Sequence, residues 1–331
     1  MRDEVLYGDA LAMLGTVPSG IVQTCVCSPP YFGLRSYLPE EHSDKAKEIG
    51  LERTPEEYVT RLVEVMREIR RTLRANGTLW LVIGDTYWNQ SPIRTSSSAA
   101  WETKYTGGKI SEGKRRCTAG HRTLKVKDLI MVPARVALAL QADGWFLRAE
   151  IIWHKSPNCM PEAVTSRPTR AHETIFMLSR SARYYYDIGA VTEPTTYREH
   201  PRHVRGPVAS PVPGAHPHTG LRRQVWSPTR RLRSVWAISP QPFAGAHRAT
   251  FPEEIPSRCI RLSTRPGDLV IDPFAGSGTT LQVAKDLDRD FLGIELNEGY
   301  RQVIEARTLP AIARAHQREM FREMMAMDEV G

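Results

Sequence analysis

The 331-residue sequence contains no long apolar run, and none approaches the roughly 20 residues that a membrane-spanning helix requires. The N-terminal stretch MRDEVLYGDA also lacks the apolar core of a signal peptide. We therefore expect no membrane partner and predict a cytoplasmic protein. Apolar residues make up 41% of the chain, which is an ordinary share for a folded protein and excludes wholesale disorder.

Cysteine is scarce, and its spacing matches no zinc pattern. Five cysteines are present. Cys25 and Cys27 fall in an apparent strand, and we expect their side chains on opposite faces of it. The other three cysteines stand alone in the sequence. The number is odd, which does not suit a framework of paired disulfides. We predict reduced structural thiols and no metal site.

Acidic residues are nearly absent from residues 196–234, where Glu199 is the single acid among eight arginines. The whole chain carries a formal net charge of +8, and a basic balance favours polyanionic partners. The segment is also rich in proline and poor in hydrophobic periodicity. Two interpretations stay open: a disordered basic linker, or a loop-rich surface that binds phosphates and bases.

Outside that segment, strands and helices alternate. Residues 55–75 show apolar side chains at helical spacing between Pro55 and Asn76-Gly77, and the strand TLWLVIGD follows at once. Continuous apolar strands separated by helices are typical of a parallel sheet covered on both faces. ETIFMLS and RYYYD (residues 183–187) look like a closing pair of strands, and Pro310 should interrupt or kink a helix that begins near Glu298.

The first unusual motif is SPPY, Ser28 to Tyr31, at the end of an apolar strand. Pro29 and Pro30 each remove a backbone donor, and the residue before a proline is driven out of the helical region. The motif therefore stops the strand abruptly and predicts a stiff, extended tip at the sheet edge.

The second motif is DPFAGSGTT, residues 272–280, in which Gly276 and Gly278 open a turn between a strand and a helix. Glycines let the backbone approach a ligand closely, and a helix start presents unpaired amides. A phosphate-binding P-loop would need a lysine, which is absent, and a dinucleotide fingerprint would need a glycine where Leu281 stands. Glu295 ends the next strand, where an acid would accept both hydroxyls of a ribose. These features indicate a nucleoside ligand without a phosphate chain, such as S-adenosylmethionine.

Together the two motifs resemble the β class of DNA amino-methyltransferases, in which the catalytic motif precedes the cofactor motif. SPPY matches the catalytic motif, DPFAGSGTT the cofactor loop, GIELN the acidic strand end, and HRATFPEEIP a further cofactor-pocket motif. EIIWHKSPNCMPE and RAHETIFMLSRSARYYYD look like the sheet-closing segment of that family. The resemblance covers most of the chain but not residues 88–122 and 188–234, as expected for variable target-reading regions.

The resemblance implies an α/β, Rossmann-like methyltransferase fold, with a mostly parallel sheet, an antiparallel closing strand and circularly permuted motif order. Residues 1–187 would form the catalytic half, with a DNA-facing loop at about 88–122. Residues 188–234 would be a target-recognition insertion, and 235–331 the cofactor-binding half of the same domain.

The resemblance also assigns roles to residues. Ser28, Pro29, Pro30 and Tyr31 would be catalytic. The cofactor S-adenosyl-L-methionine would contact Asp9, Asp272, Pro273, Phe274, Ala275, Gly276, Ser277, Gly278, Thr279, Thr280, Glu295, Leu296, Asn297, His247, Thr250 and Phe251. Asp9 equally suits the cap of a helix that starts at Ala10, and Asp272 equally suits a turn before proline.

The chemistry of the implied reaction explains SPPY. An exocyclic amine of a base is a poor nucleophile, and hydrogen bonds to Ser28 and to the carbonyl of Pro29 would favour a tetrahedral nitrogen aimed at the methyl sulfonium. Tyr31 would stack on an extruded base, which is typically worth about 1–3 kcal/mol. The base must leave the duplex because its amine is otherwise paired.

Serine in the first motif position resembles the N4-cytosine branch, so we predict N4-cytosine methylation of double-stranded DNA. A hydroxyl donor at Ser28 would suit cytosine N3, but adenine N1 is a similar acceptor. N6-adenine methylation stays an alternative, as do an RNA or protein amine methyltransferase and an inactive DNA-binding protein.

Basic side chains in the two variable regions are the candidates for DNA contacts: Arg202, Arg205, Arg222, Arg223, Arg230, Arg231, Arg233, Lys114, Arg115 and Arg116. The loop near 88–122 could equally be a surface loop. A homodimer and a cognate restriction endonuclease stay open as partners.

Overall fold

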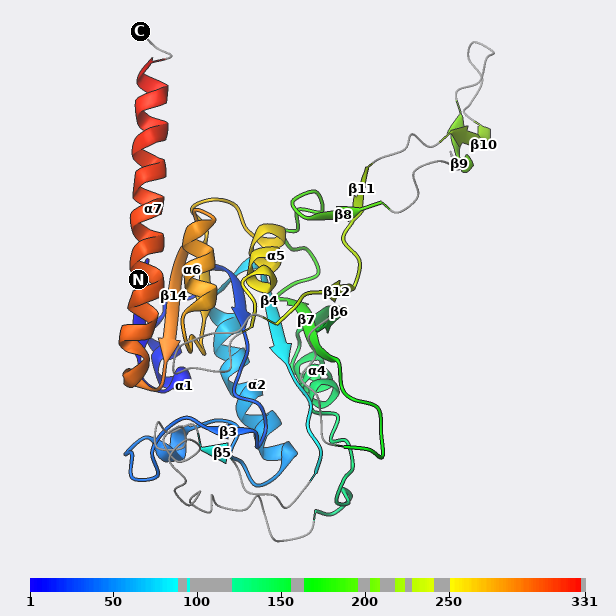
Figure 1. Ribbon diagram of the computed structural model, residues 1–331. Coiled ribbons are helices and arrows are strands. Elements are labelled where there is room, and N and C mark those ends of the chain that lie inside the picture. The colour runs from blue at the N-terminus through cyan, green and yellow to red at the C-terminus, as the bar shows by residue number, and fades with distance from the viewer. Residues whose placement is uncertain are drawn as a thin grey trace. The chain divides into compact units, whose positions relative to one another are not determined.

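The computed structural model describes residues 1–88, 94–95, 121–155, 164–195, 203–208, 218–223, 228–240 and 251–328. The chain divides into two compact units, one formed by Met1–Asp187 with Ser234–Gly331 and the other by Ile188–Arg233. The first unit holds the main sheet and its helices (Figure 1).

Within the described residues the main sheet has eight strands (Figure 1). Their order across the sheet is β1 (Glu4–Tyr7), β14 (Asp290–Glu295), β13 (Leu269–Asp272), β2 (Val22–Cys27), β4 (Leu73–Ile83), β7 (His172–Ser179), β6 (Phe146–His154) and β12 (Val235–Ala237). The first five are parallel, β7 is antiparallel to both of its neighbours, and β12 is parallel to β6. The predicted mostly parallel sheet with an antiparallel closing strand is confirmed.

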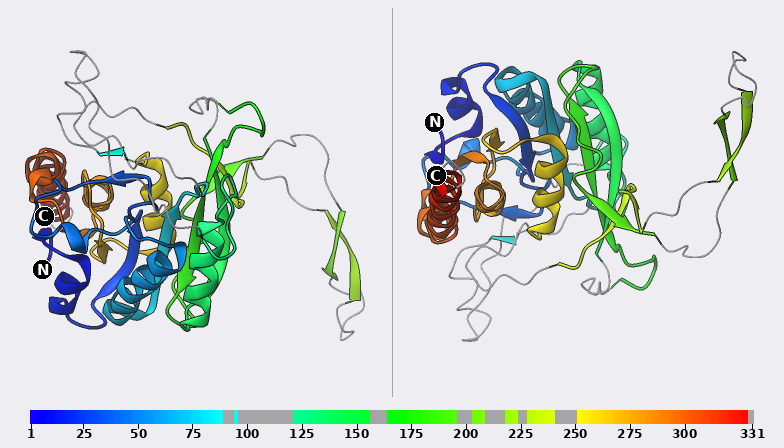
Figure 2. Two further views of the ribbon diagram at one scale, coloured as in Figure 1. Left: turned by 90° about the horizontal axis from the view of Figure 1, so that it is seen from below. Right: turned by 90° about the horizontal axis from the view of Figure 1, so that it is seen from above.

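Helices cover both faces of this sheet (Figure 2). One layer contains α1 (Ala10–Thr16), α2 (Pro55–Thr72) and α4 (Val132–Ala142), and the other contains α5 (Glu254–Ser263), α6 (Thr279–Asp286) and α7 (Arg301–Asp328). Strands buried on both sides must be apolar throughout, and every residue of β2 and of β13 is buried.

Helix α2 shows why the sequence folds as it does. Thr54 caps the helix by accepting the backbone N–H of Glu57, and Pro55 occupies the first turn, where its missing donor costs nothing. Its buried stripe, which includes Tyr58, Leu62 and Ile69, packs into the main core. The helix thereby lies beside the loop that follows β2.

Three expectations about this unit were wrong. Residues 183–187 form no strand, and the backbone N–H of Tyr185 instead donates to the carbonyl of Asn76 at 3.0 Å. Helix α7 runs through Pro310 as one helix. Cys25 and Cys27 lie on one face of β2 and not on opposite faces, because residues two apart in a strand point the same way. Both belong to the same core cluster. Cys25, Cys27 and Cys259 are buried free thiols.

The remaining elements are short. The first unit also contains a small sheet of β3 (Arg35–Ser36) and β5 (Arg94–Thr95) and the 3-10 turns η1 (Lys45–Lys47) and η2 (Glu298–Tyr300). The second unit contains two antiparallel pairs, β8 (Thr192–Pro194) with β11 (Thr229–Arg231) and β9 (His203–Val208) with β10 (His218–Arg223).

Among the described residues, no helix combines the length and apolar character needed to cross a membrane. The same part of the chain contains no group of three or more histidine, cysteine or acidic side chains that could hold a metal ion.

Candidate functional site

The two sequence motifs meet at the edge of the sheet where the parallel strands end. This edge borders a cavity of about 850 Å³, within the roughly 300–1,000 Å³ that is usual for small-molecule sites. Gly8, Ser28, Gly84, Asp272 and Glu295 all line it, at or just after the ends of β1, β2, β4, β13 and β14. Ligands of open α/β sheets bind at this edge.

Helix α2 and a neighbouring loop hold the SPPY motif in place. The Tyr58 hydroxyl, which is fully buried on α2, donates to the carbonyl of Pro30 at 2.8 Å. Gly50 approaches the same segment so closely that a Cβ there would lie 3.0 Å from the carbonyl oxygen of Tyr31. The tip is therefore fixed on both sides, as the two prolines predict.

The Tyr31 ring is packed tightly against Gly84. A Cβ at Gly84 would lie 2.4 Å from Cε2 of the ring, so only glycine fits at this position. The Tyr31 hydroxyl donates to Oε2 of Glu173 at 2.6 Å and accepts from the Ser28 hydroxyl at 3.4 Å. Burial and the adjacent Glu173 carboxylate raise the pKa of Tyr31 well above its usual value, so the phenol stays protonated.

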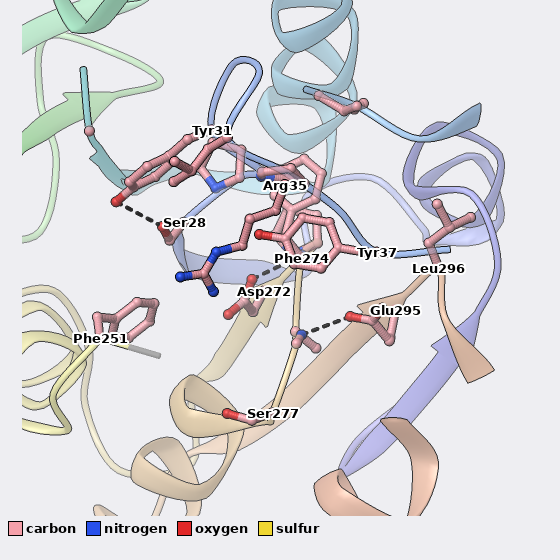
Figure 3. Close-up of a pocket in the computed structure, with 18 of the residues that line it drawn as sticks. Ser28, Tyr31, Arg35, Tyr37, Phe251, Asp272, Phe274, Ser277, Glu295 and Leu296 are labelled. Carbon is pink, nitrogen blue, oxygen red and sulfur yellow. Dashed lines mark hydrogen bonds between the residues drawn. The ribbon is translucent and has the colours of Figure 1, made fainter. Parts of the chain in front are cut away.

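The glycine loop ends in the first turn of α6. Gly278 has φ +80°, a left-handed conformation that side chains rarely adopt, and it caps α6. The backbone N–H of Gly276 donates to Oε2 of Glu295 at 2.8 Å, and the N–H of Asn297 donates to Oε1 at 2.8 Å. This pair of bonds aims the Glu295 carboxylate at the loop (Figure 3).

Two acidic residues that the sequence assigned to the cofactor pocket are almost completely buried. Glu295 is 8% exposed and Asp272 is 2% exposed. Burial raises the pKa of each carboxyl to about 7. Backbone N–H donors oppose this rise. Asn297 and Gly276 donate to Glu295, and Phe274 donates to Asp272. The backbone N–H of Phe274 donates to Oδ1 of Asp272 at 3.0 Å (Figure 3). A cationic ligand placed here would favour the ionised forms.

Asp9 caps a helix at the border of the cavity. Its Oδ1 accepts the backbone N–H of Ala12 at 3.0 Å and so caps α1. Asp9 also lines the cavity.

Most of the predicted site residues line this one cavity. They are Asp9, Ser28, Pro29, Pro30, Tyr31, Phe251, Asp272, Pro273, Phe274, Ala275, Gly276, Ser277, Thr279, Thr280, Glu295, Leu296 and Asn297. Gly278 is not part of the lining and acts through the start of α6. His247 and Thr250 lie outside the described residues.

Fewer of the predicted DNA-contacting residues can be placed. Arg202, Lys114, Arg115 and Arg116 lie outside the described residues; Arg205 is in β9, and Arg222 and Arg223 are in β10. Arg230 and Arg233 both pair with Glu193, Arg230 at 2.7 Å, whereas Arg231 is exposed. Glu193 precedes the basic segment, so counting charges within 196–234 missed this partner.

The cavity also contains residues that the sequence did not single out. One group lies around β3 and η1: Leu34, Arg35, Tyr37, Leu38, Lys47, Glu48 and Ile49. A second group comes from the β4, β6 and β7 side: Gly84, Asp85, Trp153, Lys155, Arg170, His172 and Glu173. The sequence contains one clue to the second group. Asp85 and Glu173 each stand at the end of an apolar strand, where acidic side chains can reach a site at the sheet edge.

The family model for DNA methylases of the N6/N4 class matches residues 22–306. The chain belongs to this family. It is 42% identical over 303 residues to the type II methyltransferase M.XycI of Xanthomonas campestris pv. cyanopsidis, covering 91% of this chain and 86% of the relative. M.SmaI of Serratia marcescens is 40% identical over 306 residues, with 92% and 90% covered.

Solved structures confirm the methyltransferase fold. The PvuII DNA methyltransferase, described as cytosine-N4-specific, aligns with a TM-score of 0.59 at 18% sequence identity. The alignment covers 93% of this DNA methylase and 86% of the PvuII chain. TTHA0409 of Thermus thermophilus, a putative DNA modification methylase complexed with S-adenosyl-L-methionine, aligns at 0.54 with 23% identity and 93% of each chain covered. S-adenosyl-L-methionine is the cofactor of the DNA methylase family.

Proposed function

We propose that this DNA methylase transfers a methyl group from S-adenosyl-L-methionine to the N4 amine of cytosine in double-stranded DNA. The observation that carries the proposal is a serine, Ser28, in the first position of a rigid SPPY tip that shares one cavity with the glycine loop and Glu295. The PvuII enzyme supports the fold at 18% identity, and the base assignment depends on Ser28.

The cavity offers suitable groups for each part of the cofactor. Each oxygen of the Glu295 carboxylate accepts one backbone N–H and retains a lone pair for a ribose hydroxyl. Asp9 borders the cavity beside Glu295 and would accept the adenine amine, and Asp272 would lie near the amino-acid end. When bound, the cofactor supplies an activated methyl group on a cationic sulfur.

The SPPY tip would hold the target amine. Ser28 and the carbonyl of Pro29 are acceptors for its two protons, and the fixed tip positions them before the base arrives. The ring of Tyr31 offers an aromatic surface for an extruded cytosine. Because alignment dominates methyl transfer, a rigid tip of this kind is the main requirement.

The arginines of Ile188–Arg233 and the basic residues near 114–116 are proposed to contact DNA. Arg231 is exposed and is available to phosphates or to a guanine edge. A cognate restriction endonuclease and a homodimer stay predictions.

Base-modification sequencing tests the proposal. DNA from a methylation-free host that expresses the chain should carry N4-methylcytosine within one short motif, and the Ser28→Ala variant should leave the DNA unmodified while still binding the cofactor. N6-methyladenine would contradict the base assignment. Unmodified DNA beside soluble protein would contradict DNA methylation, and a competition between duplex DNA and RNA would then identify the substrate.

A further inference from the structure

A chain of hydrogen bonds leads from Ser28 at the cavity to Glu173 on the antiparallel strand β7. The Ser28 hydroxyl contacts the Tyr31 hydroxyl at 3.4 Å, and the Tyr31 hydroxyl contacts Oε2 of Glu173 at 2.6 Å. The other oxygen of Glu173 accepts from Lys155. Lys155 in turn lies 4.7 Å from the ring centroid of Trp153, whose indole N–H donates to Ile238 at 2.9 Å.

The direction of this chain follows from its donors. Glu173 forms an ion pair with Lys155, and a carboxylate only accepts hydrogen bonds. The single phenolic proton of Tyr31 must therefore point to Glu173. Ser28 then meets only a lone pair on the Tyr31 oxygen and must donate its own proton in that direction. The Ser28 oxygen consequently faces the cavity with its lone pairs.

We propose that Glu173, acting through Tyr31, makes Ser28 an obligate acceptor for the target amine and receives the proton that the reaction releases. This inference rests on the proposed function. It replaces the idea that Ser28 donates to cytosine N3, because the only proton of Ser28 is already committed to Tyr31.

The proton balance is complete without another reactant. In the bound cofactor the methyl–sulfur bond breaks with its electron pair going to sulfur, while the N4 lone pair forms the new carbon–nitrogen bond. N4 then carries one proton too many and passes it to the Ser28 oxygen. Ser28 passes its proton to Tyr31, and Tyr31 passes its proton to Glu173. The Glu173 side chain is 16% exposed, so the proton can continue to water.

Lys155 restores the starting state. Once the proton leaves Glu173 for water, the carboxylate pairs again with Lys155. Among the described residues, Asp85 and Arg170 also line the cavity and pair with each other at 3.5 Å, and Arg35, His172 and Asp272 line it as well. Glu173 therefore acts as a positioning group that also accepts a proton through Tyr31.

The test combines Tyr31→Phe and Glu173→Gln. Phenylalanine keeps the ring and removes the proton link, and glutamine keeps an acceptor for Tyr31 and removes the carboxylate. On a duplex with the mapped motif, each variant should lower the single-turnover rate at least about tenfold. The double variant should be no slower than the slower single variant, because both changes break one chain.

Binding measurements separate this role from a structural one. Dissociation constants for S-adenosyl-L-methionine and for DNA should change less than about twofold, and a fluorescent cytosine analogue at the target position should still report stacking in Tyr31→Phe. Tyr184→Phe and Glu68→Gln make the same chemical changes outside the cavity, where Tyr184 contacts Arg148 and Glu68 contacts Arg71. Both controls should react like the wild type.

Three outcomes would overturn the inference: a Glu173→Gln enzyme as fast as the wild type, losses that multiply in the double variant, or a loss confined to binding. A wild-type enzyme that makes N4-methylcytosine while the variants remain fast contradicts the relay alone. A wild-type enzyme that makes none contradicts the relay together with the proposed function.

Discussion

Asp272 and Glu295 are buried acids of the cavity whose pKa values burial raises. Each carboxyl has a pKa raised by burial to about 7, so near neutral pH both exchange protons easily. Ionising a buried carboxyl without a cation costs free energy. A cationic ligand beside them would reduce that cost, so we expect the two ionised acids to lower the stability of the empty protein.

The pH dependence of unfolding tests this cost. The pKa of Asp272 is higher in the folded state than in the unfolded state. Between about pH 4 and pH 7 the folded state therefore binds a proton that the unfolded state has lost. The free energy of unfolding consequently falls as the pH rises through this window. Asn at this position keeps an acceptor for the N–H of Phe274. We expect Asp272→Asn without cofactor to exceed the wild type in unfolding free energy by on the order of 2 kcal/mol at pH 8.

That advantage should shrink steadily as the pH falls from 7 towards 4, and urea unfolding at four pH values would measure it. Asp268→Asn is the matched control, since Asp268 pairs with Arg74 at 2.6 Å near the opposite end of β13. An advantage for Asp272→Asn that does not vary with pH would show that ionisation of Asp272 is not the cause.

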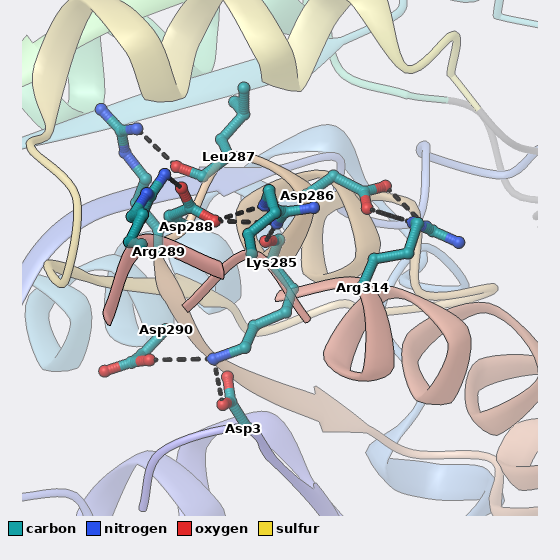
Figure 4. Close-up of polar contacts among 10 residues, drawn as sticks. Asp3, Lys285, Asp286, Leu287, Asp288, Arg289, Asp290 and Arg314 are labelled. Atoms are coloured by element: carbon teal, nitrogen blue, oxygen red, sulfur yellow. Dashed lines mark hydrogen bonds and ion pairs between the residues drawn. The ribbon is translucent and has the colours of Figure 1, made fainter. Parts of the chain in front are cut away.

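At the scale of elements, charged contacts join helix α7 to α6 and to the turn after it (Figure 4), beside buried side chains such as Ile304 and Ala311. Arg314 binds both oxygens of Asp286 at 2.7 and 3.0 Å, and Arg318 reaches Asp288 at 2.8 Å. Below them, Lys285 of α6 contacts Asp3 before β1 and Asp290 of β14. Burial alone would lower the pKa of Lys285. The two carboxylates outweigh this effect and raise the pKa above its ordinary value. The contacts fix α6, and with it the glycine loop, against the N-terminal segment.

Lys285→Met should therefore destabilise the protein. The change leaves Asp3 and Asp290 partly buried without their shared cation, and the expected loss is about 2 kcal/mol in the free energy of unfolding. Lys125→Met is the control, because Lys125 is 85% exposed and lies 3.8 Å from Asp128; its loss should be near zero. Equal losses in the two variants would contradict the role given to the Lys285 cluster.

At the scale of the whole molecule, every described residue that lines the cavity belongs to one unit, although these residues come from both ends of the chain. Val26 before the SPPY tip and Ile271 before the glycine loop lie in neighbouring parallel strands, β2 and β13. Residues 188–233 leave this unit at Asp187, and the chain re-enters it at Ser234. The arrangement predicts that cofactor binding and target reading can be separated.

Deletion of residues 188–233 tests that separation. With a short glycine–serine linker in their place, we expect the dissociation constant for S-adenosyl-L-methionine to change less than about threefold, because the cavity lies in the other unit. Methylation at the mapped motif should be lost. Retained sequence preference in the folded deletion variant, measured by modification sequencing, would contradict the target-recognition role of this segment.

The sequence by itself determined the family, the order of its motifs and about half of the described residues that line the cavity. SPPY and DPFAGSGTT carry this information because proline and glycine act on the backbone within a few residues, so their effect does not depend on distant neighbours. Helix α2 was predictable for the same reason, since its cap and its apolar stripe are local.

Only the tertiary structure decided how these groups work. Glu173 reaches Tyr31 because β7 runs antiparallel beside β4, and Gly84 admits the Tyr31 ring because β4 ends there. The proton direction at Ser28 and the raised pKa values of Asp272 and Glu295 follow from such packing. Residues 183–187 show the converse: they were expected to pair as a closing strand, but the structure has β6 beside β7, and the backbone of Tyr185 bonds to Asn76 instead. These properties arise from neighbours distant in sequence, which a local pattern does not contain.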